Sequence, residues 1–196
     1  MNISIEKCTK KNWLSKSVAF IAFFLATQTA HAQDFVSAQK KSAALTCSNT
    51  AAAIKINQLK TIYRPYDKNL KIKKITGCGL TKINNMNLVN FSFDAEIHEG
   101  PTVYRALILE FASFDEKKNK FTTVRSEIVD QIPESGDPAD TQYEQTAEFE
   151  FGFDKNNKNL KLKIQPLAKY QKIEPYYLKF NRKKNWFEND FSNLKK

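Results

Sequence analysis

The sequence contains few of the residues from which catalytic and metal sites are usually built. Its 196 residues include two histidines and three cysteines. It has no Cys-x-x-Cys pair, no Gly-x-Ser-x-Gly turn and no phosphate-binding loop. The first absence argues against a structural zinc site, the second against a serine hydrolase and the third against a P-loop nucleotidase. We therefore expect no cofactor, no metal and no enzymatic activity.

The sequence also lacks an apolar run long enough to span a membrane. The longest run, Val18–Ala26, is about half of the roughly 20 residues that a spanning helix needs. Ala30-His31-Ala32 follows it and has the small-residue pattern of a cleavage site. Four lysines precede the apolar run, at Lys7, Lys10, Lys11 and Lys16. This pattern predicts a secretory signal peptide over residues 1–32, cleaved after Ala32, and a membrane anchor is the weaker interpretation.

Export has consequences for location and charge. No cysteine stands at the expected cleavage site, so we expect no lipid anchor and a periplasmic or secreted protein with no stable membrane anchor. Residues 33–196 have the length of a single domain and keep +7 of the formal charge of +10. A basic excess favours acidic partners or anionic surfaces.

The cysteine count predicts a disulfide. Cys8 leaves with the expected signal peptide, and Cys47 and Cys78 remain. Two cysteines in an oxidising compartment admit one pairing. The alternatives are a metal-binding pair or a reactive thiol, for which the sequence offers little support.

The stretch Asp34–Tyr63 is predicted to be helical. Its first part is rich in alanine and lysine, which favour helices. Its later part places apolar residues three, four and seven positions apart, as on one face of a helix, and Pro65 would end it. This apolar stripe consists of Leu45, Ala52, Ile56, Leu59 and Tyr63.

The central feature of the remaining sequence is the pair of runs Val103–Phe114 and Phe121–Ile132. The first is apolar on both alternating faces, as in a strand buried on both sides. Pairing Phe114 with Phe121 across a turn at residues 115–120 predicts the register of a hairpin. That register sets three cross-strand pairs, which are Glu110 with Arg125, Arg105 with Asp130, and Leu107 with Ile128.

Other runs also alternate as strands do. Leu88–Ile97 places Val89, Phe91, Phe93, Ala95 and Ile97 on one face. We expect Tyr143–Phe153 to pair with Leu160–Ile164, with Phe153 opposite Leu160 and Glu150 opposite Lys163. Further strands are predicted at Leu70–Thr76, with a bulge near Lys74-Ile75, at Tyr176–Arg182, and at Trp186-Phe187. The turn residues Asp/Asn and Lys-Asn recur after Phe114, Phe153 and Phe180, which we interpret as repeated turn chemistry.

These elements predict one α+β domain over residues 33–196. Its N-terminal amphipathic helix would pack on an antiparallel β-meander of about six to eight strands. A helix followed by a meander that wraps it resembles the cystatin-like arrangement, a likeness of architecture that implies no function. A β-barrel with the helix as a plug is the alternative.

Two acidic groups are weak candidates for chemistry. His98, with Glu96 and Glu99, could form an acid–base pair, but a turn histidine among carboxylates is usually solvated. The loop around residues 130–140 has carboxylates that could bind calcium, although their order differs from that of an EF-hand. These are Asp130, Glu134, Asp137 and Asp140.

Basic and aromatic residues concentrate near the C-terminus and form the candidate binding surface. A second basic group, Lys68, Lys71, Lys73 and Lys74, lies earlier in the sequence. Such a composition also occurs in nucleic-acid grooves, but export argues against that ligand. The ordinary explanation is that these lysines keep sheet faces soluble. The candidate surface comprises Lys169, Tyr170, Lys172, Tyr176, Tyr177, Lys179, Arg182, Lys183, Lys184 and Trp186.

The functional expectation is a small exported binding protein that acts on a protein partner or an anionic cell-envelope component. Inhibitors and immunity-type proteins belong to this class. The first alternative is a carrier that holds an apolar ligand between helix and sheet. The second is a hydrolase that uses His98 with nearby carboxylates. The sequence leaves the oligomeric state open.

Overall fold

The computed structural model describes residues 35–38, 41–50, 52–100, 102–133, 143–156 and 158–190. Within these ranges the chain is all-β and antiparallel. Its strands are β1 (Phe35–Ser37), β2 (Lys41–Ala44), β3 (Cys47–Thr50), β4 (Ala53–Ile56), β5 (Thr61–Tyr63), β6 (Lys71–Ile83), β7 (Met86–Glu99), β8 (Thr102–Asp115), β9 (Lys120–Pro133), β10 (Gln145–Asp154), β11 (Leu160–Ala168), β12 (Tyr176–Asn181) and β13 (Trp186–Asn189).

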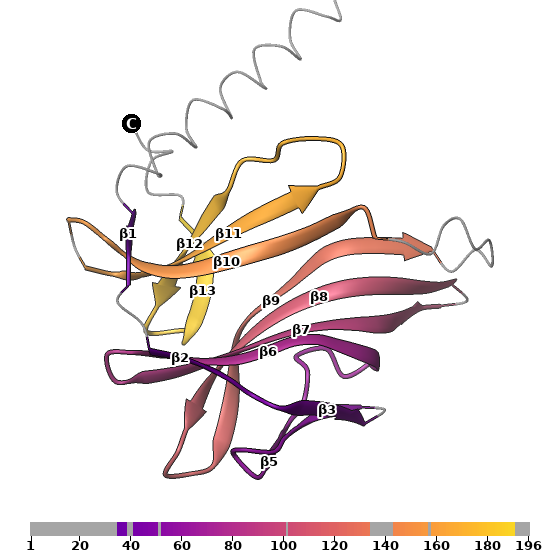
Figure 1. Cartoon of the computed structure of the whole chain (residues 1–196), viewed down its shortest axis with the longest axis horizontal. Helices are drawn as coiled ribbons and strands as arrows, with labels where there is room; N and C mark the ends of the chain where they lie inside the picture. The colour runs from indigo at the N-terminus through magenta and orange to yellow at the C-terminus, as the bar shows by residue number, and fades with distance from the viewer. Residues whose placement is uncertain are drawn as a thin grey trace, which may run out of the picture.

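The strands form three sheets stacked in layers (Figure 1). The upper sheet has the order β1-β10-β11-β12-β13, and the middle sheet has the order β2-β6-β7-β8-β9. The small sheet, β3-β4-β5, lies against the other face of the middle sheet. The chain passes from the upper sheet to the middle sheet between β1 and β2, so the N-terminal segment links two layers.

Two hydrophobic cores fill the spaces between the layers. Phe111, Phe151 and Phe187 are fully buried between the upper and middle sheets. Ile54 and Phe91 are fully buried between the middle and small sheets. The middle sheet is therefore covered on both faces, as the two apolar faces of Val103–Phe114 predicted.

The predicted N-terminal helix is wrong. Residues that were assigned to it form β1 to β5, and Asp34 lies outside the described residues. The alanine and lysine preference for helix is worth only a few tenths of a kcal/mol per residue, whereas burying an isoleucine is worth about 1.5–3 kcal/mol. Ile54 and Ile56 point into the core with Lys55 exposed between them, a period of two that suits a strand.

The absence of this helix from the described residues also makes both predicted fold classes wrong, because the α+β domain and the barrel with a helix plug each need it. The likeness to the cystatin-like arrangement ends with it as well. Among the described residues there is no helix of the length and hydrophobicity needed to cross a membrane. The expected signal peptide, residues 1–32, lies outside the described residues.

The predicted antiparallel strands are confirmed, with differences in register. Phe153 pairs with Leu160 and Glu150 with Lys163, as expected. Phe114 pairs with Phe121, but a bulge between the pairs of Ala112 and Phe111 shifts the register by one residue, so Phe111 lies opposite Arg125 and Glu110 opposite Ser126. A second bulge, between the pairs of Ile108 and Leu107, places Leu107 opposite Asp130. Each bulge inserts one residue that has no partner, which alternation alone does not reveal.

The predicted disulfide is present. Cys47 in β3 is bonded to Cys78 in β6, with Cα atoms 6.3 Å apart. The backbone N–H of Leu45 also donates to the carbonyl of Cys78. The bond therefore ties the small sheet to the middle sheet.

Candidate binding groove

The buried carboxylate of Glu110 joins the small sheet to the middle sheet. Tyr63 Oη donates to its Oε2 at 2.5 Å, and Ser126 Oγ donates to Oε1 at 2.9 Å. The backbone N–H of Tyr66 donates to both oxygens, at 3.1 and 3.3 Å. The carboxylate thus holds β5, β9 and the segment after β5 around one point on β8.

Burial changes the acidity of both partners in this hydrogen-bonded pair. It raises the pKa of Glu110, and the hydrogen bonds from Tyr63, Ser126 and the Tyr66 N–H act against that rise. Burial and the neighbouring Glu110 carboxylate raise the pKa of Tyr63 far above its usual value. Tyr63 therefore remains a hydrogen-bond donor throughout the neutral range.

The segment from residue 64 to residue 70 forms a wall beside this centre. Pro65 is buried, and the Tyr66 N–H is fixed by Glu110. Asp67 Oδ1 accepts a hydrogen bond from the N–H of Asn69 at 2.8 Å, closing a short turn. Leu70 then enters the core immediately before β6. The wall is thus held at its start by a carboxylate and at its end by an apolar side chain.

An open groove with a volume of about 620 Å³ lies between this wall and the β8–β9 face of the middle sheet. Tyr66 and Ile128 are unusually exposed for large apolar side chains, at 62% and 53%. Trp186 begins β13, and its ring centroid lies 5.3 Å from that of Tyr66. We call this the aromatic groove, and its lining residues are Tyr66, Asp67, Lys68, Asn69, Leu70, Ile97, Ile108, Ser126, Ile128 and Trp186.

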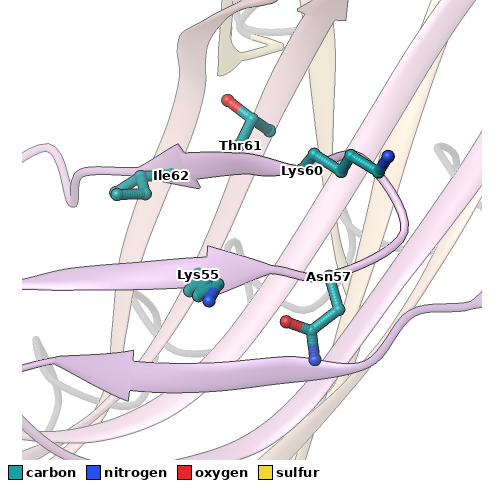
Figure 2. Close-up of a pocket in the computed structure, with 5 residues that line it drawn as sticks. All are labelled: Lys55, Asn57, Lys60, Thr61 and Ile62. Atoms are coloured by element: carbon teal, nitrogen blue, oxygen red, sulfur yellow. The ribbon is translucent and has the colours of Figure 1, made fainter.

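A second depression, of about 430 Å³, lies on the small sheet (Figure 2). Lys55 stands on β4 and Ile62 on β5, while Asn57 and Lys60 flank the turn between these strands. Lys60 extends over the turn, away from Lys55. This depression has one exposed apolar side chain and no aromatic ring, so it offers less binding energy than the aromatic groove.

The structure divides the candidate basic–aromatic surface among separate places. Lys169, Tyr170 and Lys172 lie in the connection that precedes β12, whereas Arg182, Lys183 and Lys184 form the turn that follows it. Tyr176 faces the core of the upper sheet, and Tyr177 packs against Phe35. Lys179 lies opposite Lys161 and Glu188 within the sheet. Of the ten residues, Trp186 lines the aromatic groove, and Lys68 from the earlier basic group joins it.

The other acidic candidates have mainly structural surroundings. Glu96 forms ion pairs with Lys71, at 3.2 Å, and with Lys73. His98 Nε2 lies 3.8 Å from the same carboxylate and is half exposed. Asp130 Oδ2 accepts hydrogen bonds from the backbone N–H groups of Glu144 and Gln145. The rest of the candidate calcium loop, Glu134, Asp137 and Asp140, lies outside the described residues.

Apart from Trp186 and Lys68, the residues that build the aromatic groove were not predicted from the sequence. Tyr63 and Tyr66 were assigned to the expected helix or left beyond its end, and Ile128 was expected to face Leu107. One signal was present in the sequence, because Glu110 is the only acidic residue inside the apolar run Val103–Phe114. A carboxylate on a buried strand needs hydrogen-bond donors, so it marks a place where another segment must meet the sheet.

Comparisons with known proteins do not identify the groove. No protein-family model, curated protein or solved structure matches this chain.

Proposed function

We propose that the protein is an exported, non-catalytic binding protein that receives a segment of a protein partner in the aromatic groove. The observation that carries this proposal is the exposure of two apolar side chains in the groove, Tyr66 on the wall that Glu110 holds and Ile128 on β9, with the Trp186 ring beside Tyr66. Aromatic side chains in a preformed groove supply most of the binding energy at many protein interfaces. Inhibitors and immunity-type proteins act in this way, because they bind a partner protein and catalyse no reaction.

Charge supports an acidic partner segment. Lys68 lines the aromatic groove, and the turn Arg182–Lys184 is separated from Trp186 by Asn185 alone. Residues 33–196, the exported part of the chain, keep +7 of the formal charge of +10. An apolar side chain flanked by carboxylates would fill the groove and meet Lys68, and the basic excess of the protein would raise the association rate at low salt.

Export is the proposed context. The Cys47–Cys78 disulfide is compatible with an oxidising compartment, and the signal-peptide pattern of residues 1–32 supports the periplasm or the cell exterior. Against a hydrolase, the Glu96 carboxylate near His98 already pairs with two lysines. We expect His98→Ala to leave the binding function unchanged.

Affinity capture from the host's envelope fraction tests the proposal. The bait is the tagged protein, and the groove variant is Ile128→Asp, which places a charge at an already exposed position. The matched control is Tyr170→Ala, which removes an aromatic ring that is 76% exposed and lies outside the groove. We expect the native protein and Tyr170→Ala to retain the same stoichiometric protein, and Ile128→Asp to lose it.

The proposal fails if Ile128→Asp retains that protein as well as the native chain does. It also fails if Tyr170→Ala loses it equally, because the binding energy would then come from the β11–β12 connection. Thermal unfolding of both variants shows that each is folded before capture is compared.

A further inference from the structure

Lys161 is a buried lysine on the upper sheet. It lies opposite Gly152 of β10 and Lys179 of β12, and its side chain is 2% exposed. A Cβ at Gly152 would meet the ring of Phe35, so β1 covers the face that Gly152 and Lys161 share. Lysine is almost never buried to this extent unless it is paired.

Two carboxylates converge on this amine. Asp154 Oδ2 lies 3.3 Å from Lys161 Nζ, and Asp190 Oδ2 lies 3.4 Å from it. The two side chains are 14% and 5% exposed. An amine, the carboxyl group that it would attack and a second acid–base group thus share one site with little access to water.

We propose that Lys161 and Asp190 become joined by an amide bond between their side chains. Transfer of a proton from the Lys161 ammonium to the Asp190 carboxylate gives the neutral amine and the neutral acid between which the amide forms. The Lys161 Nζ–Asp190 Cγ bond forms, and the bond from Cγ to one carboxyl oxygen breaks. Asp154 takes the second proton from nitrogen and delivers it to the departing hydroxyl. An ammonium and a carboxylate become an amide and one water, with no oxidant or co-reactant.

The two aspartates have different roles because their positions differ. Asp154 Oδ1 accepts a hydrogen bond from the N–H of Asn156 at 2.9 Å, which holds this carboxylate in its turn. That arrangement suits a group that accepts and returns a proton. Asp190 is the less exposed of the two and directly follows β13, an edge strand of the upper sheet. The amide bond would clamp this edge to β11 and keep it from fraying.

Intact-mass measurement tests the proposal. The full gene product is purified, its N-terminus is determined, and the mass is measured after reduction and denaturation. We expect a mass lower than that of the sequence by one water molecule. Tryptic digestion should yield a branched peptide in which the residue 161 segment is joined to the residue 190 segment. Lys161→Arg keeps the positive charge but lacks the lysine amine that forms the amide. Its mass should therefore equal that of its own sequence from the determined N-terminus, with no loss of water.

Asp154→Asn tests the role of the second carboxylate. The variant should remain folded, as judged by thermal unfolding, and should form the bond at least tenfold more slowly than the native chain. An unmodified native mass would overturn the proposal and leave an ordinary buried ion pair. A water loss that persists in Lys161→Arg, or a branched peptide that ends at Asp154, would also overturn it. An unaltered rate in Asp154→Asn would contradict the proton transfer.

Discussion

At the scale of single residues, Glu110 explains how a small three-stranded sheet is held on a larger one. Its carboxylate receives hydrogen bonds from β5, from β9 and from the wall of the aromatic groove. A buried carboxylate is costly unless such donors surround it. The same group therefore positions the groove and ties two layers together.

Tyr63→Phe removes the shortest of these hydrogen bonds, together with the one between the Tyr63 hydroxyl and Thr123 Oγ1. The phenylalanine ring keeps the stacking on Phe91, whose centroid lies 4.2 Å away, and removes only the hydroxyl. We expect a loss of about 1–3 kcal/mol in the free energy of unfolding, because Glu110 stays buried with one donor fewer. Urea denaturation measures the change. Tyr170→Phe is the control and should leave stability unaltered, and equal stabilities for Tyr63→Phe and the native protein would contradict this role.

Glu110→Gln makes a prediction about pH. Burial raises the pKa of Glu110 in the folded protein above its usual value of 4.5, so the folded state binds its proton more tightly than the unfolded state. The stabilising contribution of this group is complete below the unfolded pKa and falls as pH rises through the folded pKa. The native protein's stability relative to Glu110→Gln should therefore decrease as pH rises through this window, as urea denaturation at several pH values would measure.

Glu96→Gln should give the opposite pH dependence when its stability is compared with that of the native protein in the same urea denaturation experiment. The hydrogen bond from Lys73 is the main cause of the lowered pKa of Glu96, so its contribution is present above 4.5 and is lost as pH falls through the folded value. Stability relative to this variant should increase with pH over the acid range. If the stability difference between native protein and variant changed with pH in the same direction for Glu110→Gln and Glu96→Gln, the assignment of a raised pKa to Glu110 would be wrong.

At the scale of elements, hydrogen bonds from backbone N–H groups to short polar side chains stabilise the turns between strands. Asp115 Oδ1 accepts hydrogen bonds from the N–H groups of Lys117 and Lys118, and Asn181 Oδ1 does the same for Lys183 and Lys184. Asn119 and Asn185 close these turns with positive φ. The recurring sequence pattern is thus confirmed as repeated turn chemistry.

Gly152 determines how β1 joins the upper sheet. A Cβ at this position would lie 2.5 Å from the Val36 carbonyl oxygen and would strike the Phe35 ring. We expect Gly152→Ala to displace β1 and lower the free energy of unfolding by roughly 1–3 kcal/mol, as overpacking does. Gly77→Ala is the matched control, since its new Cβ would approach Ser92 Cβ no closer than 3.5 Å. Urea denaturation compares the two, and equal effects would show that β1 tolerates the added carbon.

At the scale of the whole molecule, the sequence predicted the parts whose determinants are local. Phe149, Phe151 and Phe153 alternate with polar residues, and their register with β11 follows from matching apolar sets. The helix prediction failed because the segment after residue 34 is decided by distant partners, namely β6 through Cys78 and β8 through Glu110. The aromatic groove could not be predicted for the same reason, since Tyr66 and Trp186 meet only after the sheets stack.

The disulfide should set how firmly the small sheet is attached. It joins residues 31 positions apart, and in the chain-entropy model closing such a loop stabilises a protein by about 3–4 kcal/mol. Reducing it should lower the free energy of unfolding by that amount and speed amide exchange in β3 to β5. Urea denaturation with and without reductant measures the first effect. An unchanged midpoint would mean that the hydrogen bonds of Glu110 suffice to hold the small sheet.

The proposed function requires the partner to contact the aromatic groove. Hydrogen–deuterium exchange of the protein, alone and with the captured partner, measures this contact. We expect slower exchange at residues 66–70, at 126–129 and around Trp186, with no change in the depression at residues 55–62. Protection confined to that depression or to the connection at residues 169–172, with the groove exchanging as in the free protein, would contradict it.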